Sequence, residues 1–220
     1  MKREIITTSD GSTSIHLPDW EESYHSKHGA IQEAKHVFIK NGFSCCNEKS
    51  ISILEIGFGT GLNAFITFLE AKQSDQNIEY IGVEAYPVAM EEVMQMNYPA
   101  ALNANEFNTV FKLFHESEWN KAVTFSPTFS LTKRKQFFKD IEDQNHFNLI
   151  YFDAFGFRVQ PELWSVEIFK KMYKALKPGG ILVTYACRGP IKRAMMEAGF
   201  QIEKLAGPPG KREMLRGRKV

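Results

Sequence analysis

Three closely spaced glycines between an apolar segment and an amphipathic one are the feature that most constrains the fold of this chain. Residues 50–56 (SISILEI) have the composition of a buried parallel strand and end directly before Gly57. Residues 61–73 then place leucine, isoleucine and phenylalanine at helical spacing. This order of strand, glycine turn and helix predicts the first crossover of an α/β domain that binds a nucleotide-like ligand.

The glycines at 57, 59 and 61 predict the ligand-binding loop itself. Without Cβ atoms, the chain can make a tight turn and a ligand can approach the backbone closely. The unpaired N–H groups at the start of the following helix then face that ligand. We therefore expect Gly57, Gly59 and Gly61 to belong to a cofactor site.

The residues around the loop favour S-adenosylmethionine over NAD. A dinucleotide fingerprint requires glycine or alanine at position 62, where this chain has Leu62. Glu55, two residues before the first glycine, would be unfavourable beside a pyrophosphate. It suits the ammonium group of a methionine moiety instead, so we expect Glu55 in the cofactor site as well.

The remaining apolar segments alternate between strand and helix patterns. They predict strands at 50–56, 78–84, 109–115, 147–153, 181–185, 200–205 and 214–218, the last antiparallel to its neighbours. Helices are expected at 31–39, 61–73, 166–176 and 190–198, and Pro87 is suited to open a further one. The fold class is α/β, with a doubly wound, mostly parallel sheet of the Rossmann-like class I methyltransferase type. We expect one domain, 1–220, with an N-terminal extension at 1–40 and an insertion near 119–145 whose phenylalanines cover the sheet.

Acidic residues follow three of the predicted strands, at the edge where open α/β sheets bind ligands. Glu84 ends the second strand, where a carboxylate can accept hydrogen bonds from both ribose hydroxyls. Glu116 ends the third, where it would accept a hydrogen bond from an adenine amino group; a surface position is the alternative. Both residues are candidates for the cofactor site.

Asp153 follows the fourth predicted strand and is the candidate catalytic residue. It opens the segment Asp-Ala-Phe, residues 153–155. A carboxylate here can hold an amine through its N–H groups, direct the lone pair at a methyl group, and accept a proton. The aromatic face of Phe155 can interact with a sulfonium cation. A turn-capping aspartate is the structural alternative.

Composition and charge exclude several classes of protein. With 43% hydrophobic and 24% charged residues, the chain can form a packed core. No apolar run is long enough for a membrane span, and the N-terminus lacks the apolar centre of a signal peptide. The three cysteines form no CxxC motif, so we expect a reduced, cytoplasmic protein with no membrane partner. The histidines at 25 and 28 lack further ligands at metal-binding spacing, so no metal is expected.

The positive charge is concentrated in two places. Residues 204–220 carry six basic residues against one acidic residue, Glu213, and Lys133–Lys135 form a second cluster. Such clusters are commonly solvated surface. The alternative is a polyanionic substrate, with these residues as phosphate contacts.

Several longer motifs resemble one family. The motifs are LEIGFGTGLN (54–63), FDAF and PELWS (152–155 and 161–165), LKPGGILVTY (176–185), EAGF (197–200) and GPPGKREML (207–215). Together with the opening YHSKHG (24–29), they are similar to the methyltransferase part of the tRNA wobble-uridine enzyme MnmC and its free-standing form, MnmD. The similarity runs from about residue 20 to 216.

The resemblance implies an S-adenosylmethionine-dependent enzyme that acts on tRNA. It implies methylation of the primary amine of 5-aminomethyl-2-thiouridine at the wobble position, giving 5-methylaminomethyl-2-thiouridine. It places Asp153 in the reaction site and Tyr24, Ser26 and Glu33 at the border of the same pocket. With tRNA as the substrate, we also expect substrate-binding roles for Phe155 and for Lys211, Arg212 and Arg216 of the basic C-terminal cluster. The oxidase half of MnmC has no room within 220 residues. A separate enzyme is therefore expected to supply the aminomethyl precursor.

One departure from the family pattern concerns the substrate. The residues after Asp-Ala-Phe are usually alanine or serine and proline, whereas here Gly156-Phe157-Arg158 follow. A methyltransferase or an aminopropyltransferase of the spermidine-synthase type, acting on another amine, therefore stays open as an alternative. A fold that binds without catalysis is a third possibility, which the combination of Gly57–Gly61, Glu84 and Asp153 disfavours.

Overall fold

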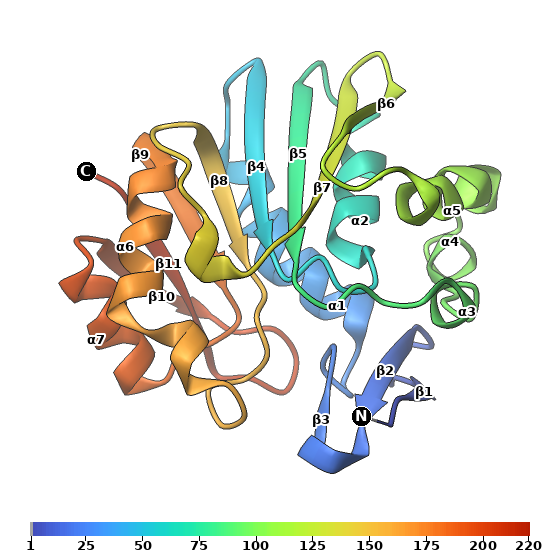
Figure 1. The fold of residues 1–220 in the computed structure, drawn as a ribbon, viewed down its shortest axis with the longest axis horizontal. Helices are drawn as coiled ribbons and strands as arrows, with labels where there is room; N and C mark the ends of the chain where they lie inside the picture. Colours follow the sequence, from blue (N-terminus) through green and yellow to red (C-terminus); the bar gives the residue numbers. More distant parts are fainter. Residues whose placement is uncertain (1) are drawn as a thin grey trace.

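The computed structural model describes residues 2–220 and contains an eight-stranded sheet in the order β10-β11-β9-β8-β4-β5-β7-β6 (Figure 1). Strands β7, β5, β4, β8 and β9 run parallel to one another. Strand β11 is antiparallel to β9 and β10, as predicted for the last strand, and β6 is antiparallel to β7. The strand bounds are β4 Ser50–Ile56, β5 Asn77–Glu84, β6 Ala122–Ser126, β7 Phe129–Lys135, β8 Phe147–Phe152, β9 Leu176–Thr184, β10 Gln201–Ala206 and β11 Glu213–Arg218.

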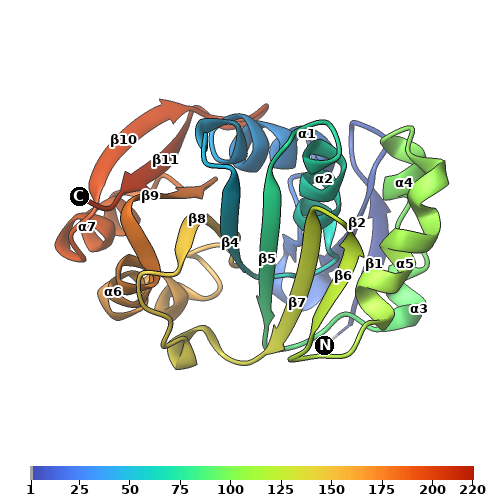
Figure 2. The same ribbon diagram turned by 90° about the horizontal axis from the view of Figure 1, so that it is seen from above.

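Helices cover both faces of this sheet (Figure 2). The α-helices are α1 Ala30–Ala34, α2 Leu62–Ala71, α3 Met90–Val93, α4 Tyr98–Ala101, α5 Asn108–Glu116, α6 Val166–Ala175 and α7 Gly189–Glu197. A π-helical segment, η2 Lys35–Lys40, continues α1, and 3-10 turns lie at η1 Pro18–Trp20, η3 Phe43–Cys45, η4 Asn105–Phe107, η5 Phe138–Asp140 and η6 Pro161–Trp164. Helices α1, α2 and α5 pack on one face, and α6 and α7 pack on the other.

The alternation of side chains along β4 explains this layered arrangement. Ile51 and Ile53 point into the core beneath α1, α2 and α5, whereas Leu54 and Ile56 point into the core beneath α6 and α7. A strand buried on both faces needs a continuous apolar run, and this requirement is met by residues 50–56. The structure therefore shows the predicted α/β, mostly parallel fold.

A small antiparallel sheet precedes the main one and lies near the carboxyl ends of its strands (Figure 1). It consists of β1 Glu4–Thr7, β2 Thr13–Leu17 and β3 Glu22–Ser23. Thr13 exchanges hydrogen bonds with Asn97, and the Arg3 guanidinium lies 2.8 Å from the Glu92 carboxylate. These contacts hold the sheet beside the ends of β4 and β5.

The prediction of a strand at 109–115 is wrong, because this segment is helix α5. Phe111 and Phe114 are three residues apart, so they share one face of a helix but would lie on opposite faces of a strand. Both are buried against α2, whereas Leu113 is exposed. The expected helix start at Pro87 is also wrong, since α3 begins at Met90.

The third parallel strand is β7, which lies within the segment expected to be an insertion. Residues 122–135 form a hairpin, β6 and β7, and β7 pairs with β5. Phe129 is buried inside the sheet's core, and Phe137 is exposed, so these phenylalanines do not form one cluster over the sheet. The inward positions of β7 are Phe129, Leu131 and Lys133, and the buried lysine interrupts the apolar alternation that would have indicated a strand.

The helical assignment of residues 108–116 predicts very different effects for two neighbouring substitutions. Phe114→Ala removes a fully buried ring that packs against Phe65, Phe68, Phe125 and Phe129. We expect it to lower the free energy of unfolding by about 3–5 kcal/mol, as large-to-small core changes do. Leu113→Ala, at a position that is 44% exposed, is expected to change it by less than about 0.5 kcal/mol. Equal effects in urea unfolding would contradict the assignment.

Candidate functional site

Two connected cavities lie at the carboxyl ends of β4, β5 and β8. The larger has a volume of about 870 Å³ and contacts the glycine loop after β4 and the residues after β5. The smaller, of about 460 Å³, lies between the segment after β3, α1 and the loop after β9. Asp153, Tyr24 and Tyr185 line both cavities. The sheet topology thus places these three residues between two cavities that are each large enough for a ligand.

The glycine loop has the conformation that its sequence predicts. Gly57, Gly59 and Gly61 have φ angles of +88°, +49° and +73°, a region that residues with a Cβ rarely adopt. Each glycine also avoids a specific contact. A Cβ on Gly57 would lie 2.6 Å from the Asp153 carbonyl oxygen, and one on Gly61 would lie 2.8 Å from His115 Nε2. Gly57 and Gly59 line the larger cavity, whereas Gly61 forms the N-cap of α2.

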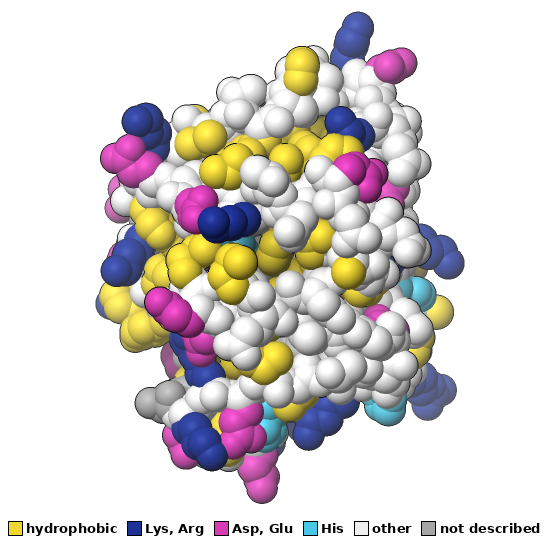
Figure 3. Space-filling view, turned by 90° about the vertical axis from the view of Figure 1, so that its right-hand side faces the viewer, with side chains coloured by type: hydrophobic (Ala, Val, Ile, Leu, Met, Phe, Trp, Pro, Cys, Tyr) yellow, Lys and Arg dark blue, Asp and Glu magenta, His cyan; other side chains and the backbone are white. Residues whose placement is uncertain are grey.

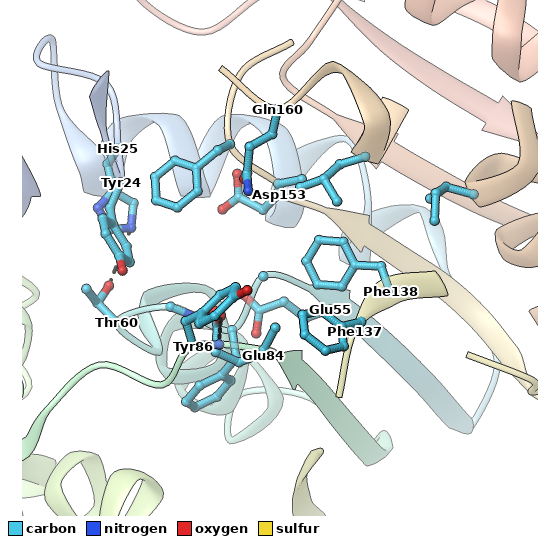
Figure 4. A pocket seen from close by; sticks show the side chains of 18 of the residues that line it. Tyr24, His25, Glu55, Thr60, Glu84, Tyr86, Phe137, Phe138, Asp153 and Gln160 are labelled. Atoms are coloured by element: carbon cyan, nitrogen blue, oxygen red, sulfur yellow. Dashed lines mark hydrogen bonds between the residues drawn. The ribbon is translucent and has the colours of Figure 1, made fainter. Parts of the chain in front are cut away.

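Glu84 is fixed at the end of β5 by backbone N–H groups. Its carboxylate accepts hydrogen bonds from Gly59 N at 3.0 Å and from Tyr86 N at 2.9 Å. It also lines the larger cavity (Figure 4). The carboxylate is therefore held beside the glycine loop at the wall of the larger cavity.

One amide joins two acidic residues of the site. Asn63 Nδ2, on the first turn of α2, donates to Glu55 Oε1 and to Asp153 Oδ2, both at 2.9 Å. Glu55 is buried on β4, and burial raises the pKa of its carboxyl well above its usual range. Glu55 Oε2 and Asn63 Oδ1 have no hydrogen-bond partner among residues 2–220. Buried polar atoms without partners suit a site that is completed by a ligand.

Asp153 lies where the two cavities meet. Burial, and then the negative charge of Glu33, raise the pKa of its carboxyl to about 7, while the hydrogen bond from Asn63 and the charge of Lys211 act in the opposite direction. Figure 4 shows its side chain pointing into the larger cavity across from Glu55 and Glu84. A carboxyl group with this pKa can both accept and release a proton near neutral pH.

The smaller cavity contains a partly buried ion pair. The carboxylate of Glu33, on α1, contacts Lys211 Nζ and accepts a hydrogen bond from Ser26 N at 3.0 Å. Lys211 comes from the loop before β11, and its ammonium lies 3.9 Å from the centre of the Tyr185 ring. The structure thus brings Ser26, Glu33 and Lys211 together in one cavity.

Aromatic rings line the larger cavity on two sides. Tyr24 and Phe155 pack edge to face, with ring centres 5.0 Å apart, and Trp20 packs on the other side of Phe155. Opposite them, Tyr86 and Phe137 pack edge to face, and Phe138 lies beside them (Figure 4). Flat rings next to Glu84 can hold a purine, since a ribose bound at Glu84 would carry its base to this side.

Glu116 does not belong to the cofactor site. It ends helix α5, pairs with Lys112 at 3.2 Å, and lines neither of the two cavities. The misassigned strand at 109–115 is the reason for this error. The residues that follow the true third strand, β7, are the ones that reach the cavity, and they include Phe137 and Phe138.

The two basic clusters do not present the free phosphate contacts that were expected from the sequence. Lys133 is buried and donates to the His115 carbonyl, and burial lowers the pKa of its ammonium to about 8. Arg134 pairs with Asp143 at 2.7 Å. The Arg216 guanidinium pairs with Glu203 at 2.6 Å and is largely covered, so it lines neither cavity. Arg212 is exposed but lies outside both cavities.

Asn63, Tyr185 and Phe137 are site residues that the sequence analysis did not identify. Asn63 has a usable signal, because it is the second residue of the helix after the glycine loop and so faces the ends of neighbouring strands. Tyr185 directly follows β9, at the same edge of the sheet as Asp153. Phe137 has no such signal, since its strand was not predicted.

Two further observations concern residues 2–220. No helix in this range has both the length and the apolar composition needed to cross a bilayer. The same residues contain no group of three or more histidine, cysteine, aspartate or glutamate side chains placed to bind a metal ion.

The parallel sheet, the left-handed glycine loop and Glu84 at the end of β5 define a Rossmann-like class I methyltransferase. A family model described as S-adenosyl-L-methionine-dependent methyltransferase matches residues 105–220, more than half of the chain. The chain belongs to this family, and its cofactor is S-adenosylmethionine. The residues present fit this cofactor, because Glu55 and Asn63 offer unpaired buried oxygens and Glu84 offers a fixed carboxylate.

Curated relatives carry a more specific name. The chain is 30% identical over 237 residues to the tRNA 5-methylaminomethyl-2-thiouridine biosynthesis bifunctional protein MnmC of Burkholderia mallei (strain SAVP1), a match that covers 97% of this chain and 35% of that protein. The protein of the same name from Aromatoleum aromaticum is 29% identical over 214 residues, covering 89% and 32%. This chain thus spans about one third of the length of these relatives.

Solved structures support the fold. MNMC2 from Aquifex aeolicus superposes with a TM-score of 0.76 at 22% identity, over 98% of this chain and 70% of that one. A spermidine synthase in complex with the transition-state analogue AdoDATO superposes with a TM-score of 0.56 at 15% identity, over 100% and 74%. At these identities the two superpositions show a shared fold.

The conformation of Gly57 leads to a prediction about cofactor binding. Gly57→Ala forces a Cβ against the Asp153 carbonyl, so the loop and Asp153 must move. We expect at least a tenfold loss of S-adenosylmethionine affinity, measured by isothermal titration calorimetry. Gly179→Ala is the matched control, because Gly179 also has a positive φ angle but has no atom within 4 Å of an added Cβ. An equal loss in both variants would show a general backbone effect instead.

The pKa of Asp153 leads to a prediction about stability. Between its ordinary value of 3.8 and about 7, the folded protein holds a proton that the unfolded chain lacks. Stability therefore falls as the pH rises through this range. Asp153→Asn removes this pH dependence. At pH 8 we expect the free energy of unfolding of the variant to exceed that of the natural protein by about 2 kcal/mol. This figure is smaller than the full pKa shift would give, because Asp153 borders open cavities in which solvent screens its charge. At pH 4 the difference should shrink, and urea unfolding at both pH values measures it.

Proposed function

We propose that this protein methylates the primary amine of 5-aminomethyl-2-thiouridine at the wobble position of tRNA, giving 5-methylaminomethyl-2-thiouridine. The placement of Asp153 between the two cavities carries this proposal, because it is where a cofactor in the larger space and an amine in the smaller one would meet. The name of the MnmC relatives, which match 97% of the chain, supports the choice of substrate.

The smaller cavity suits an amine. Its inner part carries the carboxyl groups of Asp153 and Glu33, and the Lys211 ammonium is neutralised by its contact with Glu33. A carboxylate that accepts N–H hydrogen bonds attracts a protonated amine from water. We assign Ser26 and Tyr24 to the walls that position the attached base.

Asp153 then has two tasks. Its carboxylate accepts hydrogen bonds from the N–H groups of the amine, which directs the nitrogen lone pair toward the larger cavity. It also accepts the proton that the ammonium form must lose before the nitrogen can take up the methyl group. S-adenosylmethionine supplies, when bound, a methyl group activated by its sulfonium. The Tyr24 and Phe155 rings exclude water from the meeting point and present π faces to a cation.

An aminopropyltransferase is the second candidate, since the chain shares its fold with spermidine synthase. Glu55 and Asn63 do not decide between the two, because their unpaired oxygens suit an amino group and the decarboxylated cofactor keeps that group. The name of the MnmC relatives favours the methyltransferase. We further propose that a separate enzyme supplies the aminomethyl nucleoside, and that this enzyme and the present protein both act in the cytoplasm.

Transfer of a labelled methyl group tests the proposal directly. The purified protein is incubated with methyl-labelled S-adenosylmethionine and tRNA that lacks the final methyl group, and the digested nucleosides are separated. We expect the label in 5-methylaminomethyl-2-thiouridine. Asp153→Asn is expected to lower kcat by at least about 100-fold while it leaves cofactor affinity within a few-fold.

Two results would contradict the assignment. Label in another nucleoside, or no label despite tight cofactor binding, would place the substrate elsewhere. Full activity of Asp153→Asn would exclude Asp153 from catalysis, and incubation with decarboxylated S-adenosylmethionine and a polyamine tests the aminopropyl alternative in the same preparation.

A further inference from the structure

The rim of the smaller cavity carries exposed cations, in contrast to its acidic interior. Lys27 lies between β3 and α1, Arg158 lies in the loop after β8, and Arg188 precedes α7. All three are exposed and line the same cavity as Asp153 and Glu33. We call Lys27, Arg158 and Arg188 the basic rim.

The members of the basic rim differ in how strongly they are engaged. The Arg158 guanidinium donates to the carbonyls of Trp20 and Glu21, at 2.7 and 3.1 Å, and lies 3.9 Å from the Glu22 carboxylate. Within residues 2–220, Lys27 and Arg188 form no side-chain hydrogen bond or ion pair. The Glu22 carboxylate offsets part of the charge of Arg158, so Lys27 and Arg188 are the cations that a ligand can reach.

The positive surface continues beyond the rim toward the last strand. The hydrogen bond from Lys204, and then the charges of Arg212 and Lys192, lower the pKa of the Glu213 carboxyl, which places these cations in one neighbourhood. Arg212 lies in the same loop as Lys211, and Lys192 lies one turn after Arg188 on α7. A different face, on the side of α3, α4 and α5, is shown in Figure 3, and there Lys and Arg side chains are scattered around apolar patches.

This arrangement of charge matches a nucleotide within an RNA strand. A base that carries an aminomethyl group is cationic at its tip, and its flanking phosphates are anionic. The smaller cavity has the complementary arrangement, with carboxyl groups inside for the cationic tip and the basic rim outside for the anionic phosphates. We propose, on the basis of the proposed function, that Lys27 and Arg188 bind the phosphates that flank the modified nucleotide, and that Arg212 and Lys192 extend this contact along the RNA backbone.

Phosphate contacts of this kind supply affinity and position but no sequence readout. Each neutralised phosphate releases counterions, so the RNA affinity weakens with salt in proportion to the number of contacts. These phosphate contacts differ from those expected from the sequence. Lys133, Arg134 and Arg216 are engaged by other groups of the protein and are therefore not available to RNA.

RNA binding by the whole protein tests this surface without any need for methyl transfer. The probe is a fluorescein-labelled anticodon stem-loop RNA, and its anisotropy gives the Kd over a series of salt concentrations. For the double variant Lys27→Ala/Arg188→Ala we expect about a tenfold higher Kd at constant salt. The slope of log Kd against log salt should fall by about 1.5, as expected for two lost contacts.

The matched control is Lys49→Ala/Lys174→Ala. Both lysines are exposed, and they lie at the opposite edge of the sheet, before β4 and near the end of α6. The control is expected to bind RNA as the natural protein does. Calorimetric titration of S-adenosylmethionine into each variant verifies that the cofactor cavity is folded.

The outcomes separate this proposal from the proposed function. If the natural protein methylates the wobble nucleoside but the rim variant binds RNA normally, the phosphate surface is wrong and the function stands. If it methylates no tRNA while the rim variant loses RNA affinity, the surface stands and the function is wrong. Equal losses in the rim and control variants, or no RNA binding by the natural protein, would overturn the surface.

Discussion

The site depends on one amide group held between two carboxyl groups. Asn63 Nδ2 bridges Glu55 on β4 and Asp153 after β8, so three separate segments converge on a single donor. Two carboxyl groups brought together inside a protein repel each other when both are ionised. The bridge and the raised pKa of Asp153 lower this cost, and they fix the reacting carboxyl relative to the glycine loop.

The topology of the sheet explains why the site consists of two cavities. The strands that hold the glycine loop and Glu84 are adjacent, so their loops border the larger cavity. Strand β8 lies on the other side of β4, and its following loop carries Asp153 toward α1 and β9. Asp153, Tyr24 and Tyr185 line both cavities and therefore lie where the two meet.

Local patterns determined most of the fold, and their limits explain the errors. The loop at 57–61, the strand at 50–56 and the acid at 84 were predictable because each depends on neighbouring residues in the chain. Residues 109–115 were misassigned because TVFKLFH fits both periods, and only burial against α2 decides between them. This error moved the third strand and produced the wrong role for Glu116. Partners far away in sequence, such as Glu203 for Arg216, could not be read from a charge pattern.

The contact between Glu33 and Lys211 joins residues that are 178 positions apart. The wall of the smaller cavity is therefore complete only when α1, near the start of the chain, and the loop before β11, near its end, are both in place. Because the entropic cost of joining two chain segments grows only slowly with the length between them, the long intervening chain is no obstacle to this contact. The ion pair thus ties the first helix to the edge hairpin of β10 and β11 across the main sheet.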